Sequence, residues 1–268
     1  MHPTFLYGTA WKEDETERLT RLAIDAGFRG IDSANQRKHY FEAGVGAAIA
    51  SAIAERVVRR DDLFVQTKFT YRRGQDHRLP YDPRADYATQ VRQSFASSLE
   101  HLGVEAIDSY VLHGPSRGRG LGAEDFEVWR AMEELRAAKK TRFLGISNVA
   151  LEQLETLCER VNVRPAFVQN RCYARTRWDA AVRAFCKDSG IVYQGFSLLT
   201  ANVAELRSAR FREIVARVGR TPAQIVFRFA RQVGMLPLTG TTNPAHMRED
   251  LAIEDFVLSD EEVAKIEG

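Results

Sequence analysis

Short apolar runs alternate along the chain with longer segments whose apolar residues recur at helical spacing. In the longer segments, positions such as Leu19, Leu22, Ala23 and Ala26 share one face of a predicted helix. The short runs are typical of buried parallel strands. There are eight of them: Phe5-Leu6-Tyr7, Gly30-Ile31-Asp32, Leu63 to Phe69, Ser109 to His113, Arg142 to Ser147, Ala166 to Asn170, Ile191 to Phe196 and Met235 to Thr239.

Eight such βα units can close into a barrel or form an open, doubly wound sheet. The first run is followed by Gly8-Thr9-Ala10-Trp11, which lacks the Gly-x-Gly-x-x-Gly pattern of a Rossmann dinucleotide site. The chain of 268 residues has a suitable length for a single barrel domain. We therefore predict one (β/α)8 TIM barrel over residues 1–268, in which a dinucleotide would have to bind in another way.

Composition limits the classes of partner. The 38 basic and 36 acidic residues nearly balance, which argues against nucleic acid or an anionic membrane. No apolar run is long enough to cross a bilayer, and the N-terminus does not resemble a signal peptide, so we expect a cytoplasmic protein. The three cysteines lack the close spacing of a disulfide framework or a metal site. The oligomeric state stays open.

Three consecutive strands are predicted to end on ionisable side chains, namely Asp32, Lys68 and His113. A buried strand should carry such a group only where the group has a partner. In a barrel these strands are neighbours, so the three side chains would converge at the C-terminal mouth, where barrel enzymes build their sites. Each residue alone has a plain structural explanation, but together they predict an acid–base site. A tyrosine among them would be acidified by the Lys68 ammonium, and the set could protonate a carbonyl oxygen.

Several motifs, in their order and spacing, resemble the aldo-keto reductase superfamily from about Phe5 to Gly268. They are Tyr7-Gly8-Thr9-Ala10-Trp11, Ala23 to Asp32, Asp61 to Lys68, Asp108 to Pro115, Gly145-Ile146-Ser147-Asn148 and Val168-Gln169-Asn170. The resemblance implies a (β/α)8 barrel that binds a nicotinamide cofactor, usually NADPH, and reduces a small carbonyl substrate through an Asp, Tyr, Lys, His tetrad. The hydride would come from the cofactor, and the protein would supply position, electrostatics and the proton.

Asp32, Lys68 and His113 match this tetrad directly, but the tyrosine is displaced. Arg37 stands at the usual position, and Tyr40 follows three residues later. The stretch Gln36 to Tyr40 (QRKHY) resembles a divergent branch in which the tyrosine of this stretch is the acid. We therefore prefer Tyr40; the alternatives, in falling order, are His39, Tyr7 and Tyr71. If Tyr40 is the acid, residues 36–39 must bulge to bring its hydroxyl within hydrogen-bond reach of Lys68.

The resemblance also implies a set of cofactor-binding residues. Ser147, Asn148 and Gln169 would hold the nicotinamide carboxamide, while Phe196, followed by Ser197, would stack on its ring. The cofactor phosphates would meet Gly240, Thr241 and Thr242. A lysine common near Gly240 is absent and His246 stands near the usual arginine, which leaves Arg248 as the expected partner of a 2′-phosphate. NADPH is the preferred cofactor and NADH the alternative.

By comparison with the family it resembles, we expect the N-terminal hairpin and the C-terminal substrate loop to be reduced or absent, and the substrate site to be open. We expect its lining to come from Trp11 and from residues 70–86, including Tyr71. In this segment Arg72, Arg73 and His77 could bind an anionic substrate, although a charged loop is more often solvated. Two other functions stay open: a cofactor-binding regulatory or partner subunit with little turnover, and a pathway enzyme for one complex biosynthetic intermediate.

Overall fold

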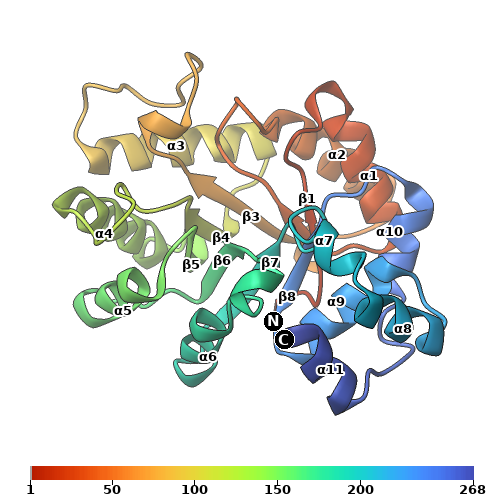
Figure 1. Cartoon of the computed structure of the whole chain (residues 1–268). Helices are drawn as coiled ribbons and strands as arrows, with labels where there is room; N and C mark the ends of the chain where they lie inside the picture. Colours follow the sequence, from red (N-terminus) through yellow and green to blue (C-terminus); the bar gives the residue numbers. More distant parts are fainter. Residues whose placement is uncertain (1) are drawn as a thin grey trace.

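The computed structural model describes residues 2–268, which form eight parallel strands closed into one barrel (Figure 1). Each strand pairs with the next, and β8 pairs with β1. The strands are β1 (Leu6–Gly8), β2 (Gly30–Asp32), β3 (Phe64–Phe69), β4 (Ile107–Leu112), β5 (Thr141–Ser147), β6 (Phe167–Arg171), β7 (Val192–Phe196) and β8 (Leu236–Thr239). The predicted barrel and its eight strands are thus confirmed, and the predicted strand ends shift by no more than two residues.

The helices follow the strands and surround the barrel (Figure 1). They are α1 (Thr16–Ala26), α2 (Glu42–Ala54), α3 (Tyr87–Leu102), α4 (Ala123–Ala137), α5 (Leu151–Arg160), α6 (Ala180–Asp188), α7 (Val203–Leu206), α8 (Ala209–Val218), α9 (Pro222–Gln232), α10 (Pro244–Leu251) and α11 (Asp260–Glu267). Short 3-10 turns cover Glu13–Glu15, Arg60–Asp62, Arg72–Gly74 and Ala174–Thr176. Capping boxes at Thr221 and Ser259 start α9 and α11.

Inside the barrel, alternate residues of each strand point inward and form layers. The apolar layer consists of Leu6, Phe64, Phe167 and Leu236, which pack together as a cluster separate from the outer core. Gln66 and Gln169 lie two residues beyond Phe64 and Phe167 on β3 and β6. Gln194 of β7 is the strand neighbour of Gln169, and these three residues form the glutamine layer. The next inward residues, Lys68, Arg171 and Phe196, form the mouth layer at the C-terminal end. The same alternation that builds the core therefore delivers polar side chains to the mouth.

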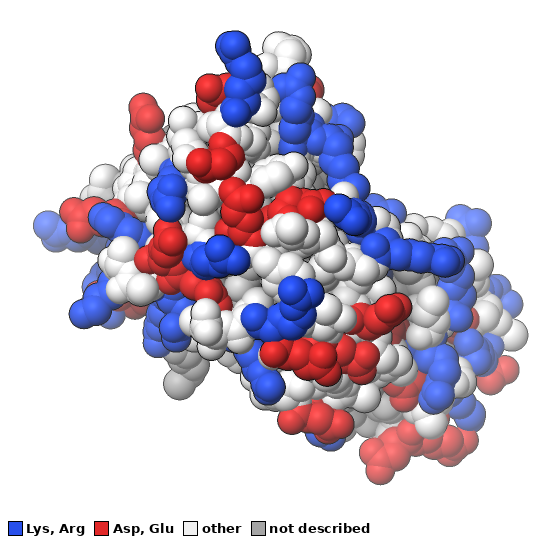
Figure 2. Space-filling view, turned by 90° about the vertical axis from the view of Figure 1, so that its left-hand side faces the viewer, with Lys and Arg blue, Asp and Glu red and all other residues white. Residues whose placement is uncertain are grey.

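The outer surface carries charges of both signs. Figure 2 shows Lys and Arg side chains interspersed with Asp and Glu side chains over much of the face that α3, α4 and α5 cover. Within residues 2–268, no helix combines the length and the apolar character that a membrane span requires.

Candidate active site

Asp32 and Lys68 form a buried ion pair at the base of the mouth. The Lys68 Nζ donates hydrogen bonds to both Asp32 carboxylate oxygens, each at 2.7 Å, and to the Ser33 carbonyl at 2.7 Å. The Lys68 and Asp32 side chains are 0% and 4% exposed, respectively. Burial lowers the pKa of Lys68, and the Asp32 carboxylate opposes that shift. The three N–H donors of the ammonium are therefore all used within the pair and its immediate surroundings.

The glutamine layer holds Asp32 from below. The Nε2 atoms of Gln66 and Gln169 donate to Asp32 Oδ1 at 2.7 and 3.0 Å. Both amides also donate to Gln194 Oε1, at 2.8 and 2.9 Å, and Gln194 Nε2 donates back to Gln66 Oε1 at 3.1 Å. Sequence reasoning missed Gln66 and Gln194 in this role. The signal that could have found them is a polar residue at an inward position of a buried strand.

The loop after β2 turns tightly and brings Tyr40 back to the barrel. The amides of His39 and Tyr40 both donate to the Gln36 carbonyl, at 3.0 and 2.9 Å, and Gln36 Nε2 donates to the Gly74 carbonyl at 2.6 Å. The Tyr40 ring centroid consequently lies 5.3 Å from Lys68 Nζ and 5.9 Å from the His113 ring centroid. The expected bulge of residues 36–39 is present.

The expected hydrogen bond between Lys68 and the Tyr40 hydroxyl is not formed within the described part of the chain. The reason is that Asp32 and Ser33 already accept all three donors of Lys68. The expected acidification is also absent, because burial and, secondarily, the Asp32 carboxylate raise the pKa of Tyr40 above its ordinary value. The phenol therefore keeps its proton at neutral pH, as a proton donor must.

His113 lies one residue beyond β4, and its imidazole is held by a residue that the sequence did not single out. The Thr70 Oγ1 lies 2.7 Å from His113 Nδ1. Burial, followed by the charge of Lys68, lowers the pKa of His113 to about 3, so the ring is neutral. With the hydroxyl as donor to Nδ1, the Nε2 atom carries the ring proton.

Two of the three alternatives to Tyr40 lie outside the cavity. The Tyr7 hydroxyl donates to the Thr241 carbonyl at 3.0 Å, and the buried Tyr71 donates to Asp125 Oδ1 at 2.8 Å. His39 does line the cavity, but its Nδ1 meets Gln36 Oε1 at 2.8 Å and its ring stacks on Trp11 with centroids 3.7 Å apart. Tyr40 is the one of the four that lies beside both Lys68 and His113.

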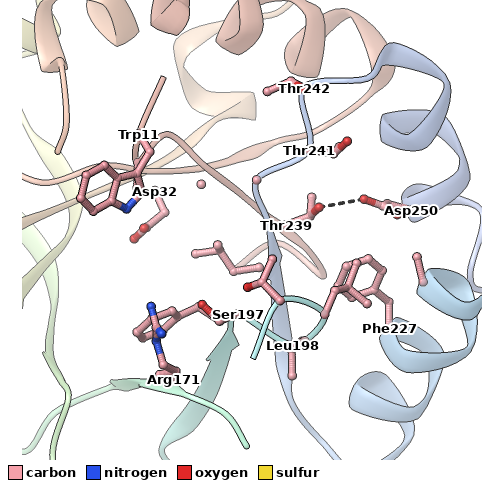
Figure 3. Close-up of a pocket in the computed structure, with 18 of the residues that line it drawn as sticks. Trp11, Asp32, Arg171, Ser197, Leu198, Phe227, Thr239, Thr241, Thr242 and Asp250 are labelled. Carbon is pink, nitrogen blue, oxygen red and sulfur yellow. Dashed lines mark hydrogen bonds between the residues drawn. The ribbon is translucent and has the colours of Figure 1, made fainter. Parts of the chain in front are cut away.

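A cavity of about 960 Å³ runs across the mouth of the barrel. Figure 3 shows Trp11, Asp32 and Arg171 at one end and Thr241, Thr242 and Asp250 at the other. The catalytic candidates that line it are Asp32, Tyr40 and His113; the cofactor and substrate candidates that line it are Trp11, Ser147, Gln169, Phe196, Ser197, Gly240, Thr241 and Thr242. Its volume lies at the upper end of the range of roughly 300–1,000 Å³ typical of small-molecule sites.

Other predicted residues lie outside this cavity. Asn148 donates from Nδ2 to the His113 carbonyl at 2.8 Å, and Arg248 is exposed on α10, where His246 and Glu249 line the cavity instead. Tyr71 and the other residues of the segment 70–86, which were expected to line the substrate site, are not among the residues that line this cavity. Tyr71 turns to α4 through its bond to Asp125.

Two cationic residues in the lining were missed, Lys12 and Arg171. Lys12 is 6% exposed, its Nζ donates to the Gly240 carbonyl at 2.8 Å, and burial lowers its pKa to about 8. Nothing in the local sequence distinguishes Lys12 from a surface lysine.

The lining fits a nicotinamide dinucleotide. Gln169 Oε1 accepts no hydrogen bond from residues 2–268, so it is free for a carboxamide N–H, and Phe196 offers an aromatic face beside it. Toward the other end, Lys12 and the segment Gly240 to Thr242 offer a cation, hydroxyls and backbone groups. These donors suit phosphates.

The fold and the site together define a barrel oxidoreductase, and comparison with known proteins identifies which kind. The sequence model of the Aldo/keto reductase family matches residues 4–268. The chain therefore belongs to the aldo/keto reductase family.

Curated relatives support this assignment over nearly the full length. The chain is 31% identical over 257 residues to 2,5-diketo-D-gluconic acid reductase B of Corynebacterium sp., covering 95% of this chain and 84% of the relative. It is 31% identical over 277 residues to D-galacturonate reductase of Fragaria ananassa, covering 95% and 81%.

Solved structures agree as well. An aldo-keto reductase complexed with NADPH superposes with a TM-score of 0.84 at 26% identity, covering 99% of this chain and 83% of the other. A Bombyx mori aldo-keto reductase in complex with NADP gives a TM-score of 0.84 at 25% identity, covering 99% and 88%. The resemblance noted in the sequence is thus confirmed, and the protein is an enzyme of the oxidoreductase class.

Proposed function

We propose that the protein reduces aldehyde or ketone groups to alcohols with NADPH and that Tyr40 donates the proton. The observation that carries this proposal is the position of the protonated Tyr40 phenol, beside Lys68 and His113 in the cavity. The cofactor follows from the lining described above and from structural neighbours that hold NADPH or NADP. When bound, the cofactor supplies the hydride.

Each protein residue then has a distinct part. The neutral His113 imidazole orients the carbonyl oxygen through its Nε2–H, with Thr70 fixing that tautomer. Tyr40 gives its proton to the same oxygen. The Lys68 ammonium stabilises the phenolate that results, because its charge lies close to the ring in a buried site. Asp32 keeps Lys68 charged and in place.

The cofactor would be held at three places. Ser147 and Gln169 would bind the carboxamide, Phe196 would stack on the ring, and Lys12 would meet the phosphates beside Gly240.

The roles of two predicted cofactor-binding residues differ from those expected, because both residues lie outside the cavity lining. Asn148 would act indirectly, by holding the carbonyl of His113, and Arg248 remains our candidate for the 2′-phosphate. Because the carboxylate of Glu249 lines that end of the cavity, NADH is the alternative cofactor.

The decisive experiment is NADPH oxidation with a panel of reactive aldehydes, using the wild type, Tyr40→Phe and, as a control, His39→Asn. Loss of a positioned general acid should lower kcat by about 10²–10⁴-fold. We expect that loss in Tyr40→Phe, with the NADPH Kd unchanged in a fluorescence titration. His39→Asn should retain most activity. Full activity in Tyr40→Phe would show that another group donates the proton.

A second candidate is a cofactor-binding regulatory or partner subunit with little turnover. It is favoured by the absence of a hydrogen bond between Lys68 and Tyr40 within residues 2–268, which follows from the occupied donors of Lys68. Tight NADPH binding without turnover of any aldehyde in the panel would support this candidate over the first. Two curated relatives are named for sugar acids, 2,5-diketo-D-gluconic acid and D-galacturonate, while another is named for prostaglandin H2.

A further inference from the structure

Arg171 is a cationic residue of the mouth layer. It is the last residue of β6 and lies on the same inward row as Phe167 and Gln169. Its strand neighbour in the register is Phe196 of β7, and its guanidinium carbon lies 5.8 Å from the Phe196 ring centroid. Arg171 therefore belongs to the mouth layer and lines the cavity.

No acidic group compensates the charge of Arg171 within residues 2–268. Its guanidinium forms no ion pair and no hydrogen bond there, and the side chain is exposed at the cavity mouth. Two comparable arginines behave differently: Arg183 pairs with Glu267, and Arg177 donates to the Gly268 carbonyl. A free guanidinium on a rigid strand end is thus available to a ligand.

The other ionisable groups at this end of the cavity are neutral or already paired. Asp32 is compensated by Lys68, and the lowered pKa values of His113 and His39 favour neutral rings. Tyr40 keeps its proton. Arg171 consequently gives the catalytic end of the cavity a net positive charge.

We propose that Arg171 binds a carboxylate of the substrate, so that the preferred substrates are aldehydes or ketones that carry a carboxylate group. This inference rests on the proposed function. The planar guanidinium presents paired N–H donors that match the two oxygens of a carboxylate. Trp11, 70% exposed and stacked on His39, forms an apolar wall for the remainder of such a molecule.

The position of Arg171 argues against a role in holding the cofactor phosphates. Figure 3 places it at the end of the cavity with Trp11 and Asp32, across from Thr241 and Thr242. The end of the cavity with Thr241 and Thr242, where the cofactor phosphates would bind, has its own cation, because the Lys12 ammonium donates to the Gly240 carbonyl.

The test compares 4-carboxybenzaldehyde, which carries a carboxylate, with its uncharged methyl ester, methyl 4-formylbenzoate. Steady-state kinetics with NADPH are measured for the wild type, Arg171→Met, Arg171→Lys and the control Arg175→Met. Arg175 is exposed on the same connection but lies outside the cavity, so its replacement removes an equal charge elsewhere. The NADPH Kd of each protein is measured in parallel.

We expect the wild type to prefer the carboxylate substrate and Arg171→Met to lower kcat/KM for it about tenfold, the effect of one charge-assisted contact in a wet site. Activity on the ester and the NADPH Kd should not change, Arg171→Lys should retain part of the preference, and Arg175→Met should match the wild type. Equal losses on both aldehydes, or a weakened NADPH Kd, would overturn the inference.

A failure of the proposed function gives a different result. In that case the wild type reduces neither aldehyde, and the inference is decided by calorimetric titration of 4-carboxybenzaldehyde into the NADP-loaded protein. Binding that weakens in Arg171→Met but not in Arg175→Met supports the carboxylate site. Equal binding to all four proteins, or binding to none, overturns it.

Discussion

Removing Lys68 should expose the free-energy cost of burying Asp32 without its counter-ion. In Lys68→Met, the apolar side chain fills the space of the lysine stem. The Asp32 carboxylate, on a residue 3% exposed, then keeps the amides of Gln66 and Gln169 as its only donors among residues 2–268. Breaking a buried ion pair costs about 3–5 kcal/mol. Because two donors remain, we expect the lower end, a loss of about 3 kcal/mol in the free energy of unfolding.

The double variant separates the lost attraction from the uncompensated charge. Asp32→Asn alone leaves a buried ammonium, whereas Asp32→Asn with Lys68→Met leaves no charge, and the new amide oxygen would still accept from the glutamine layer. The double variant should therefore lose less than the sum of the two single losses, with a coupling of about 2 kcal/mol or more. Lys68→Met and the double variant should also lose reductase activity, since the Tyr40 phenolate would lack its neighbouring cation.

Urea unfolding followed by circular dichroism measures these free energies for the four proteins. Strictly additive losses in the double variant would refute the reasoning.

Three further outcomes follow from single contacts. Thr70→Val removes the hydroxyl beside His113 Nδ1 and should lower kcat by about tenfold without changing the NADPH Kd. The control Thr70→Ser should retain activity. Nitrogen NMR of the imidazole should show a mixture of tautomers in the valine variant. The NADPH affinity of the wild type should fall as the pH rises past about 8, where Lys12 loses its proton, and fluorescence titrations of Lys12→Met should show weaker, pH-independent binding. His113 has a pKa of about 3 in the folded state and about 6.5 in the unfolded state, so below about pH 6.5 the unfolded state binds more protons. The free energy of unfolding should therefore drop by about 2 kcal/mol from pH 7 to pH 5. Urea titrations of His113→Asn should lack this drop.

Much of this architecture could be predicted because the relevant signals are local. Parallel strands buried on both faces appear as short apolar runs, so the eight strands could be located and the barrel inferred. Asp32, Lys68 and His113 interrupt that pattern at strand ends, which is why their convergence could be expected from the sequence alone. The position of Tyr40 was harder to predict, because it depends on how tightly residues 36–39 turn.

The residues that were missed or misplaced depend on information that a single sequence does not carry. The predicted sixth strand ended at Asn170, one residue short, so Arg171 did not appear on the inward row of Phe167 and Gln169. The segment of residues 70–86 follows β3 on the correct face, but its two tyrosines bond elsewhere: Tyr71 donates to Asp125, and Tyr81 donates to the Thr70 carbonyl. Strand order predicts that a loop lies on the C-terminal face of the barrel. Whether its side chains enter the cavity depends on the partners to which they bond.

The glutamine layer explains how one barrel accommodates an apolar floor and a charged mouth a few residues apart. Buried amides are costly unless they are bonded, and here Gln66, Gln169 and Gln194 bond to one another and to Asp32. Because Gln66 and Gln169 hold one carboxylate oxygen from below, Asp32 can face Lys68 with both oxygens. Lys68 is in turn fixed beside the Tyr40 ring rather than free to follow the hydroxyl. The glutamine layer thus fixes the positions of Asp32 and Lys68 at the mouth. The side chains at the strand ends then determine which substrates bind.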